Sequence, residues 1–280
     1  MKSFTTYNYS WDELIQRAAN TKSLHNLAED KKQLLQKILK LVDLTTLEGS
    51  DTQEKIKSMC DFARNLPGQL PDGGTVAAVC FYMPFIKLSK DLLKGTGIEV
   101  ATVAGGFPSG QLPLSLKVKE VEWCAAQGAD EIDVVISREL ALTGQFEKLR
   151  DEISAMKTAC GSARMKVILE TGELEKTDFI RKASIAALEG GADFLKTSTG
   201  KIKPAATPEA FLILLDTIKE YYEQTGKMAG IKAAGGISET QDAMLYYLLV
   251  KTVLGDNWLS KQYFRIGASR LVGKIVDELK

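Results

Sequence analysis

The chain has 280 residues, 45% of them apolar, and its 36 lysine and arginine residues balance its 36 aspartate and glutamate residues. With zero net charge the sequence lacks the excess of basic residues that is typical of nucleic-acid-binding proteins. No apolar stretch approaches the roughly 20 residues that span a bilayer. The first residues lack the apolar core of a signal peptide, so we expect a cytoplasmic protein that binds neither nucleic acid nor membranes.

Histidine and cysteine usage narrows the chemistry. The sequence contains one histidine, His25, in a polar stretch where we expect it on the surface, and four cysteines that are scattered singly. Histidine-based zinc sites, Ser-His-Asp hydrolysis and Cys-His nucleophiles are therefore excluded. Without a C-x-x-C motif the cysteines are expected to be reduced, partly buried small hydrophobes. Any general acid–base catalysis must therefore use carboxylates, lysines, tyrosines or water. We expect no metal and no cofactor.

The first 40 residues are polar and helical in pattern. Ser10 and Glu13 have the spacing of a helix N-cap and its third helical position. Apolar residues at positions 34, 35, 38, 39 and 41 predict a second helix. We assign residues 1–37 to an N-terminal helical extension and residues 38–280 to one large domain.

From residue 41 onward, short strand-like segments alternate with amphipathic segments. The predicted strands cover residues 41–44, 76–81, 99–103, 131–136, 166–169, 193–197, 229–232 and 264–267. The predicted helices between them include residues 114–126, 146–159, 178–188, 208–222 and 240–250. Eight alternations predict an α/β fold, a parallel (β/α)8 TIM barrel. The competing fold, a doubly wound open sheet, usually carries a G-x-G-x-x-G motif after its first strand, and none occurs there.

A short internal repeat relates the fourth and sixth predicted strands. Gly-Ala-Asp precedes each of them, at residues 128–130 and 191–193. Three positions beyond each aspartate stand Asp133 and Lys196. Because alternate strands of such a barrel supply one layer of inward side chains, we expect these two residues to share a layer. Lys232, on the seventh strand, is expected beside Lys196.

The three charged residues suggest a reaction. An ion pair between Asp133 and one lysine would leave the other lysine uncompensated inside the barrel, which is costly. Two neighbouring ammonium groups repel each other, and this repulsion lowers the pKa of one amine. A neutral lysine attacks a carbonyl to form a Schiff base, which stabilises a carbanion without a metal. Asp133 and the second lysine would then move protons.

Glycines follow the last three predicted strands. Gly235 and Gly236 follow the seventh, while Gly267 and Ser269 follow the eighth and lead into the last helix. The loops after strands 7 and 8 are the usual phosphate site of this barrel, where backbone N–H groups and a helix N-terminus hold the anion. Gly200 and Lys201, after the sixth strand, add a further glycine and a cation, so we expect a phosphorylated substrate.

Six segments in register, from about residue 38 to the C-terminus, resemble deoxyribose-phosphate aldolases. They are residues 43–47 (DLTTL), 130–135 (DEIDVV), 170–174 (ETGEL), 196–201 (KTSTGK), 230–236 (GIKAAGG) and 264–269 (FRIGAS). The resemblance implies a class I (Schiff-base) aldolase on a (β/α)8 barrel. Such enzymes reversibly cleave 2-deoxy-D-ribose 5-phosphate into D-glyceraldehyde 3-phosphate and acetaldehyde during deoxynucleoside catabolism. The extension at residues 1–37 resembles that of the longer, eukaryotic-like members.

The same resemblance implies individual roles. Lys196 resembles the Schiff-base lysine, Lys232 the lysine that lowers its pKa and joins the proton relay, and Asp133 the acid–base partner. The residues expected to contact the substrate or its phosphate are Asp43, Thr45, Thr199, Gly200, Lys201, Gly235, Gly236, Gly267 and Ser269. Ser238 and Arg270 depart from the family's pattern near the expected phosphate, which leaves the side-chain contacts of that group open.

Two alternatives remain open from the sequence. One is another Schiff-base sugar-phosphate aldolase, which would use a ketone donor and need more room around Lys196. The other is a phosphosugar-binding barrel without catalysis, although both lysines and Asp133 are retained. The expected partners are small phosphosugars and aldehydes, and a homo-oligomer is compatible with the sequence.

Overall fold

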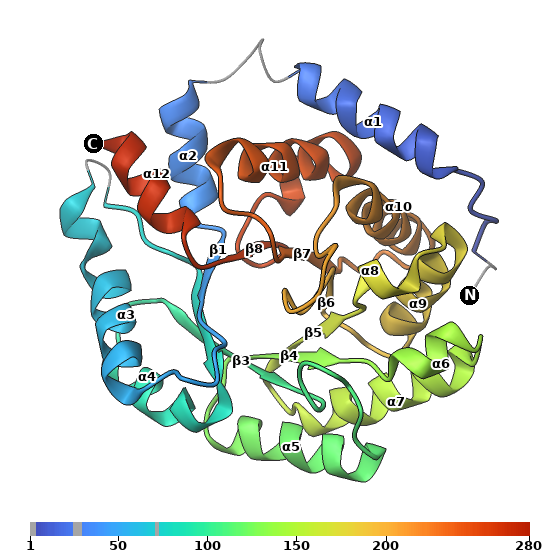
Figure 1. Ribbon diagram of the computed structural model, residues 1–280, viewed down its shortest axis with the longest axis horizontal. Helices are drawn as coiled ribbons and strands as arrows, with labels where there is room; N and C mark the ends of the chain where they lie inside the picture. The colour runs from blue at the N-terminus through green and yellow to red at the C-terminus, as the bar shows by residue number, and fades with distance from the viewer. Residues whose placement is uncertain (1–3, 25–29, 71–72) are drawn as a thin grey trace.

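The computed structural model describes residues 4–24, 30–70 and 73–280 and contains a closed barrel of eight parallel strands. Figure 1 shows the strands at the centre and the helices in a ring around them. Each strand pairs with its neighbour in chain order, and β8 returns to pair with β1. The predicted (β/α)8 barrel is confirmed. His25 lies outside the described residues.

All eight predicted strands are present, with ends that differ by at most two residues from those expected. The strands are β1 (Val42–Thr45), β2 (Ala78–Tyr82), β3 (Glu99–Ala104), β4 (Glu131–Val135), β5 (Arg164–Ile168), β6 (Phe194–Lys196), β7 (Gly230–Ala234) and β8 (Phe264–Ala268). They are short and almost wholly buried, as parallel strands are when helices cover the outside of a barrel and side chains fill its interior.

The five helices predicted between the strands are also present. They are α5 (Leu114–Ala126), α7 (Phe146–Ala159), α9 (Thr177–Glu189), α10 (Pro208–Thr225) and α11 (Thr240–Leu254). The expected helix after the last strand is α12 (Leu271–Leu279). Four further helices complete the ring or cover the loops, namely α3 (Gln53–Asn65), α4 (Ile86–Leu92), α6 (Arg138–Leu142) and α8 (Thr171–Leu174).

Two helices precede the barrel and pack on its outer ring. The first, α1 (Trp11–Leu24), begins at the expected cap, because the N–H of Ser10 donates to Glu13 and the N–H of Glu13 donates to the Ser10 hydroxyl. It lies against α10 and α11, and α2 (Lys31–Leu39) lies against α11 and α12 (Figure 1). The proposed boundary at residue 38 therefore falls within α2.

The barrel interior divides into an apolar side and a charged side. Toward the carboxyl ends of β2 and β3 the inward residues are small and apolar, namely Ala78, Cys80, Ala101 and Val103, while Glu99 at the start of β3 joins the charged side. Inward residues of β1, β4, β5, β6, β7 and β8 include buried acids and bases. The four cysteines are free and buried, as expected. In the described part of the chain no helix has both the length and the apolar character of a membrane span.

Candidate active site

Strand register places Lys196 and Lys232 side by side. The two residues are Cα partners in the β6–β7 ladder. Their ammonium nitrogens both donate to one oxygen of Asp133, with Nζ–Oδ2 distances of 2.6 Å for Lys196 and 2.8 Å for Lys232. The structure therefore brings together the three charged residues that the repeat and the strand spacing predict, and it does so at the centre of the barrel.

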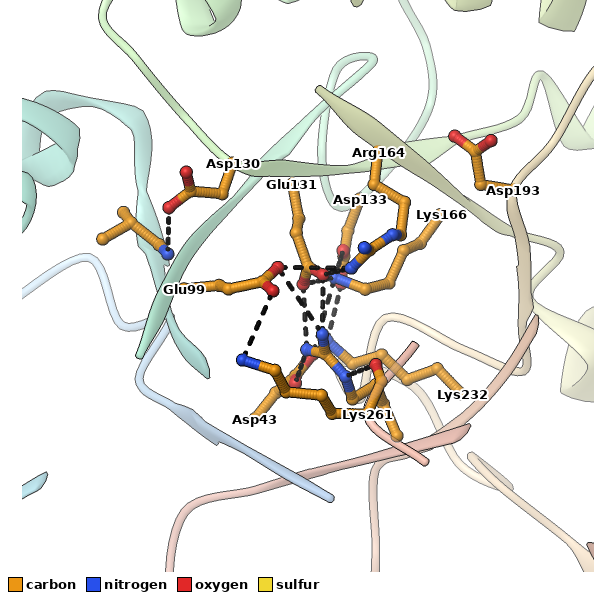
Figure 2. A network of polar contacts seen from close by, with 12 residues as sticks. Asp43, Glu99, Asp130, Glu131, Asp133, Arg164, Lys166, Asp193, Lys232 and Lys261 are labelled. Carbon is orange, nitrogen blue, oxygen red and sulfur yellow. Dashed lines mark hydrogen bonds and ion pairs between the residues drawn. The ribbon is translucent and has the colours of Figure 1, made fainter. Parts of the chain in front are cut away.

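A second group of charges lies around these three and was missed from the sequence. Lys166 donates to Asp133 Oδ1 at 3.0 Å and also to Glu131. Arg265 bridges Glu131 and Asp43, at 2.7 and 2.6 Å. Figure 2 shows the labelled members of this network turned toward one another. Glu131 could have been found by strand periodicity, since it precedes Asp133 by two positions and must point inward as well.

The charges of this interior do not balance if every group is ionised. Three carboxylates and four bases, all at most 2% exposed, form the network: Asp43, Glu131, Asp133, Lys166, Lys196, Lys232 and Arg265. One positive charge would remain uncompensated among side chains that are at most 2% exposed, which is unfavourable. Loss of one proton from one lysine makes the network neutral. The charge count thus favours one neutral amine before any particular lysine is considered.

The surroundings of the three buried lysines differ, and only Lys196 among them has a lowered pKa. Burial lowers the pKa of Lys232, but the carboxylates of Asp133 and Asp43 outweigh burial and raise it above the usual value. The pKa of Lys166 is raised in the same way, against burial, by Asp133, Glu131 and Asp43. Burial and the charge of Lys232 lower the pKa of Lys196, while Asp133 opposes them. The sequence predicts Lys232 as the cause of this lowering, and the structure places burial before it.

A cavity of about 390 Å³ opens above the lysines at the carboxyl ends of the strands. Lys196 and Lys232 reach it from below, and the loops after β1, β6, β7 and β8 form its walls. Eight of the predicted substrate-binding residues line it: Thr45, Thr199, Gly200, Lys201, Gly235, Gly236, Gly267 and Ser269. This is the face on which barrels of this type carry their active sites.

Asp43 and Asp133 do not line this cavity. Both are fully buried, and Asp43 binds Lys232 at 2.5 Å and Arg265 at 2.6 Å. The observed contacts of Asp43 hold the charge of Lys232 in place. Its contact with a substrate hydroxyl stays a prediction.

The cavity wall away from the lysines is suited to an anion. Gly235 and Gly236 adopt φ angles of 85° and 82°, a backbone conformation that exposes N–H groups at little cost only for glycine. A Cβ atom on Gly235 would lie 2.8 Å from the Cα of Gly200, so the loops after β6 and β7 touch there without room for a side chain. Gly267 and Ser269 lead into the N-terminus of α12, whose dipole favours negative charge.

Three cations surround this wall. Lys201 pairs with Glu48 at 2.9 Å, and Lys55 pairs with Asp51 at 2.5 Å. Arg270 lines the cavity and forms no ion pair with the part of the chain that the structure describes. Ser238 also lines the cavity, and its hydroxyl lies 3.3 Å from a carboxylate oxygen of Glu239. Arg270 is therefore the cation most available to a bound anion.

Comparisons with known proteins agree with this geometry. The model of the DeoC/LacD family aldolases matches residues 37–248. A putative deoxyribose-phosphate aldolase of Caenorhabditis elegans is 44% identical over 240 residues, which cover 85% of this chain and 79% of that protein. The deoxyribose-phosphate aldolase of Homo sapiens is 43% identical over 257 residues, which cover 88% and 80%. The crystal structure of a putative deoxyribose-phosphate aldolase from Toxoplasma gondii superposes with a TM-score of 0.78 at 25% identity, covering 88% of this chain and 94% of that one.

Proposed function

Because the chain belongs to the DeoC/LacD aldolase family, we propose that it is a deoxyribose-phosphate aldolase that works through a Schiff base on Lys196. The reaction is the reversible cleavage of 2-deoxy-D-ribose 5-phosphate into D-glyceraldehyde 3-phosphate and acetaldehyde. One observation carries the proposal. Lys196 and Lys232 share one carboxylate oxygen of Asp133, yet their pKa values move in opposite directions.

The neutral amine of Lys196 begins the reaction. Its Nζ attacks the C1 aldehyde of the open-chain sugar, and loss of water gives a protonated Schiff base. The C3 hydroxyl then gives up its proton, through a water, to the Asp133 carboxylate, and the C2–C3 bond breaks with its electron pair moving toward the iminium. D-Glyceraldehyde 3-phosphate leaves, the resulting enamine takes a proton at C2, and hydrolysis releases acetaldehyde and regenerates the free amine.

Lys232 and Asp133 divide the proton handling. Lys232 lines the cavity and, with its raised pKa, is a protonated donor there. Although burial opposes it, the charges of Lys166, Lys196 and Lys232 hold the pKa of Asp133 well below its usual range. Asp133 is thus an ionised acceptor behind the cavity, bonded to both amines. Protons reach the substrate from Lys232 or from water, and Asp133 passes them between the two lysines.

The substrate phosphate is placed at the far wall of the cavity. Backbone N–H groups at Gly235, Gly236 and Ser269 would hold its oxygens, and Arg270 and Lys201 would supply positive charge. This arrangement leaves the C1 end of an extended sugar near Lys196. Leu47 lines the cavity and packs with the small apolar residues of β2 and β3, so an apolar side chain is available to a two-carbon donor.

We extend the proposal to the setting of the enzyme. It acts in the cytoplasm on deoxyribose phosphate derived from deoxynucleosides. Residues 1–37 form an extension to a catalytic barrel of residues 38–280. The anion-binding wall alone would also suit a ketone-using aldolase or a non-catalytic phosphosugar-binding barrel, and the shared contact of the two lysines with Asp133 argues against the second.

Borohydride trapping tests the proposal. The protein is incubated with acetaldehyde or 2-deoxy-D-ribose 5-phosphate, reduced and mapped by peptide mass spectrometry, and we expect a reduced adduct on Lys196. Lys196→Ala should abolish both the adduct and the activity. Lys90→Ala, which removes a lysine paired with Asp130 at the surface, serves as the control and should retain both. An adduct on Lys232, or none, would refute the assignment, and ketone donors that react better than acetaldehyde would favour the rival aldolase.

A further inference from the structure

Glu170 has no part in the mechanism above, although its segment resembles the aldolase family. It follows the end of β5 by two positions, its side chain is fully buried, and it lies behind the cavity wall without lining it. We propose that Glu170 is a positioning residue, which holds the turn of residues 199–201 in the shape that binds the substrate phosphate. This inference rests on the proposed function.

Both carboxylate oxygens of Glu170 bind the same residue. Oε1 accepts the backbone N–H of Thr199 at 3.1 Å, and Oε2 accepts its hydroxyl at 2.6 Å. The Thr199 hydroxyl oxygen accepts in turn the backbone N–H of Lys201 at 3.1 Å. Because the Thr199 hydroxyl donates its proton to Glu170, the lone pairs of the hydroxyl oxygen are available to accept the N–H of Lys201. One buried carboxylate thus orders three successive residues.

The turn that Glu170 holds is part of the cavity wall. Thr199, Gly200 and Lys201 all line the cavity. Gly200 packs against Gly235 in the loop after β7, and the Lys201 ammonium reaches Glu48 in the loop after β1. A shift of Thr199 would therefore move the glycine contact and the cation together. Such a shift lies beside the expected phosphate and not beside the amine of Lys196.

The backbone at Glu170 supports a specific role for its side chain. Glu170 has φ 56° and ψ 57°, in the left-handed region that is unfavourable for a residue with a Cβ atom. A glycine would adopt this conformation without strain. Pairing with Arg138 does not account for a glutamate at position 170. Arg138 lies 2.9 Å from Glu173 and 3.6 Å from Glu170, so Glu173 is its closer partner. Both hydrogen bonds of the Glu170 side chain go to Thr199.

The test compares Glu170→Gln with a matched control. The amide keeps the shape of the side chain but has one acceptor oxygen, so it cannot accept both the backbone N–H and the hydroxyl proton of Thr199. At best the hydroxyl bond reverses direction, and both charge-assisted bonds become neutral ones. We expect KM for 2-deoxy-D-ribose 5-phosphate to rise roughly 10- to 100-fold with kcat little changed, because a group near the phosphate is displaced. Inhibition by inorganic phosphate should weaken in parallel. Cleavage of unphosphorylated 2-deoxy-D-ribose should be nearly unaffected.

Glu173→Gln is the control. Glu173 belongs to the same segment and binds the same arginine, but its side chain is only partly buried and forms its ion pair with Arg138, not with Thr199. The Glu173→Gln variant should have the same KM as the wild type for both the phosphorylated and the unphosphorylated sugar. Equal losses on the two sugars in Glu170→Gln, or a KM unchanged from wild type, would overturn the inference.

A double-variant comparison decides whether Glu170 acts through Thr199. Thr199→Val removes the hydroxyl and should raise KM for the phosphorylated sugar by itself, which also tests the inference if Glu170→Gln does not fold. The double variant should be no worse than the more impaired single variant. Effects that multiply, or a Thr199→Val enzyme that matches wild type, would refute the inference. Acetaldehyde trapping on Lys196 should persist in every variant, and its absence from the wild type would instead count against the proposed function.

Discussion

Lys166 and Asp133 are Cα partners on neighbouring strands, and the Lys166 ammonium binds Asp133 Oδ1 at 3.0 Å. This contact occupies one carboxylate oxygen and leaves the other, Oδ2, to Lys196 and Lys232. Asp133 is therefore oriented as well as ionised. Lys196, the amine that we propose to react, thus shares its carboxylate with Lys166, a residue that does not line the cavity.

Removal of Lys232 should move the pH dependence of catalysis upward. Burial and the charge of Lys232 lower the pKa of Lys196, so Lys232→Met removes the second cause and the Lys196 pKa should rise. The three remaining bases would then match the three carboxylates, which also favours a protonated Lys196. We expect the acid limb of the kcat/KM profile to shift to higher pH and the rate to fall about 10²- to 10⁴-fold through loss of a proton donor. An unshifted acid limb would show that burial alone sets the pKa.

Removal of Lys166 should mainly lower the free energy of unfolding. Lys166→Met would leave Asp133 and Glu131 short of a cation in a fully buried interior. Breaking such a network by removing one partner costs about 3–5 kcal/mol of unfolding free energy. Urea denaturation followed by circular dichroism measures this loss. Lys261→Met, which removes a partly exposed lysine near Glu99, is the comparison and should cost less than about 1 kcal/mol. A stable Lys166→Met protein would mean that water, a protonated carboxyl or a protonated Lys196 replaces the missing charge.

Acid should unfold the protein through the barrel carboxylates. Although burial opposes it, the charges of Lys166 and Arg265 lower the pKa of Glu131 from its ordinary 4.5 to about 2. A carboxylate with a lowered pKa in the folded state stabilises the fold above its unfolded pKa, and this stability is lost as pH falls toward the folded value. The unfolding free energy should therefore drop between pH 4.5 and pH 2. Glu131→Gln should be less stable at pH 7 but lose less over that interval, and an identical acid slope in the two proteins would contradict the assignment.

Arg270 should matter for phosphorylated substrates only. It lines the cavity without an ion-pair partner in the described chain, so its charge is free to bind the phosphate. Arg270→Ala should raise KM for 2-deoxy-D-ribose 5-phosphate by roughly 10-fold or more, the value of one charge-assisted hydrogen bond. Lys55→Ala is the matched control, because Lys55 lines the same cavity but is held by Asp51. Steady-state kinetics on the phosphorylated and unphosphorylated sugars distinguish the two, and equal effects of both variants would remove Arg270 from the phosphate site.

Local patterns in the sequence determined the helices and strands and the placement of Lys196 beside Lys232. The ends of α5 and α7 coincide with the predicted segments at residues 114–126 and 146–159, because apolar periodicity is a property of neighbouring residues. Lys196 and Lys232 could be placed on adjacent strands because one strand–helix–strand unit separates them. The Gly-Ala-Asp repeat brought Asp133 to the same layer, since alternate strands of a closed barrel meet inside it.

Only the tertiary structure decided which charges meet. Glu131, Lys166 and Arg265 come from three strands, and their contacts depend on barrel closure and on a register that no local pattern encodes. The position of Asp43 beneath the cavity and the hold of Glu170 on Thr199 arise in the same way. Because side chains alternate along a strand, the sequence shows which of them face inward. The partner of a buried charge depends instead on the packing of strands that lie far apart along the chain.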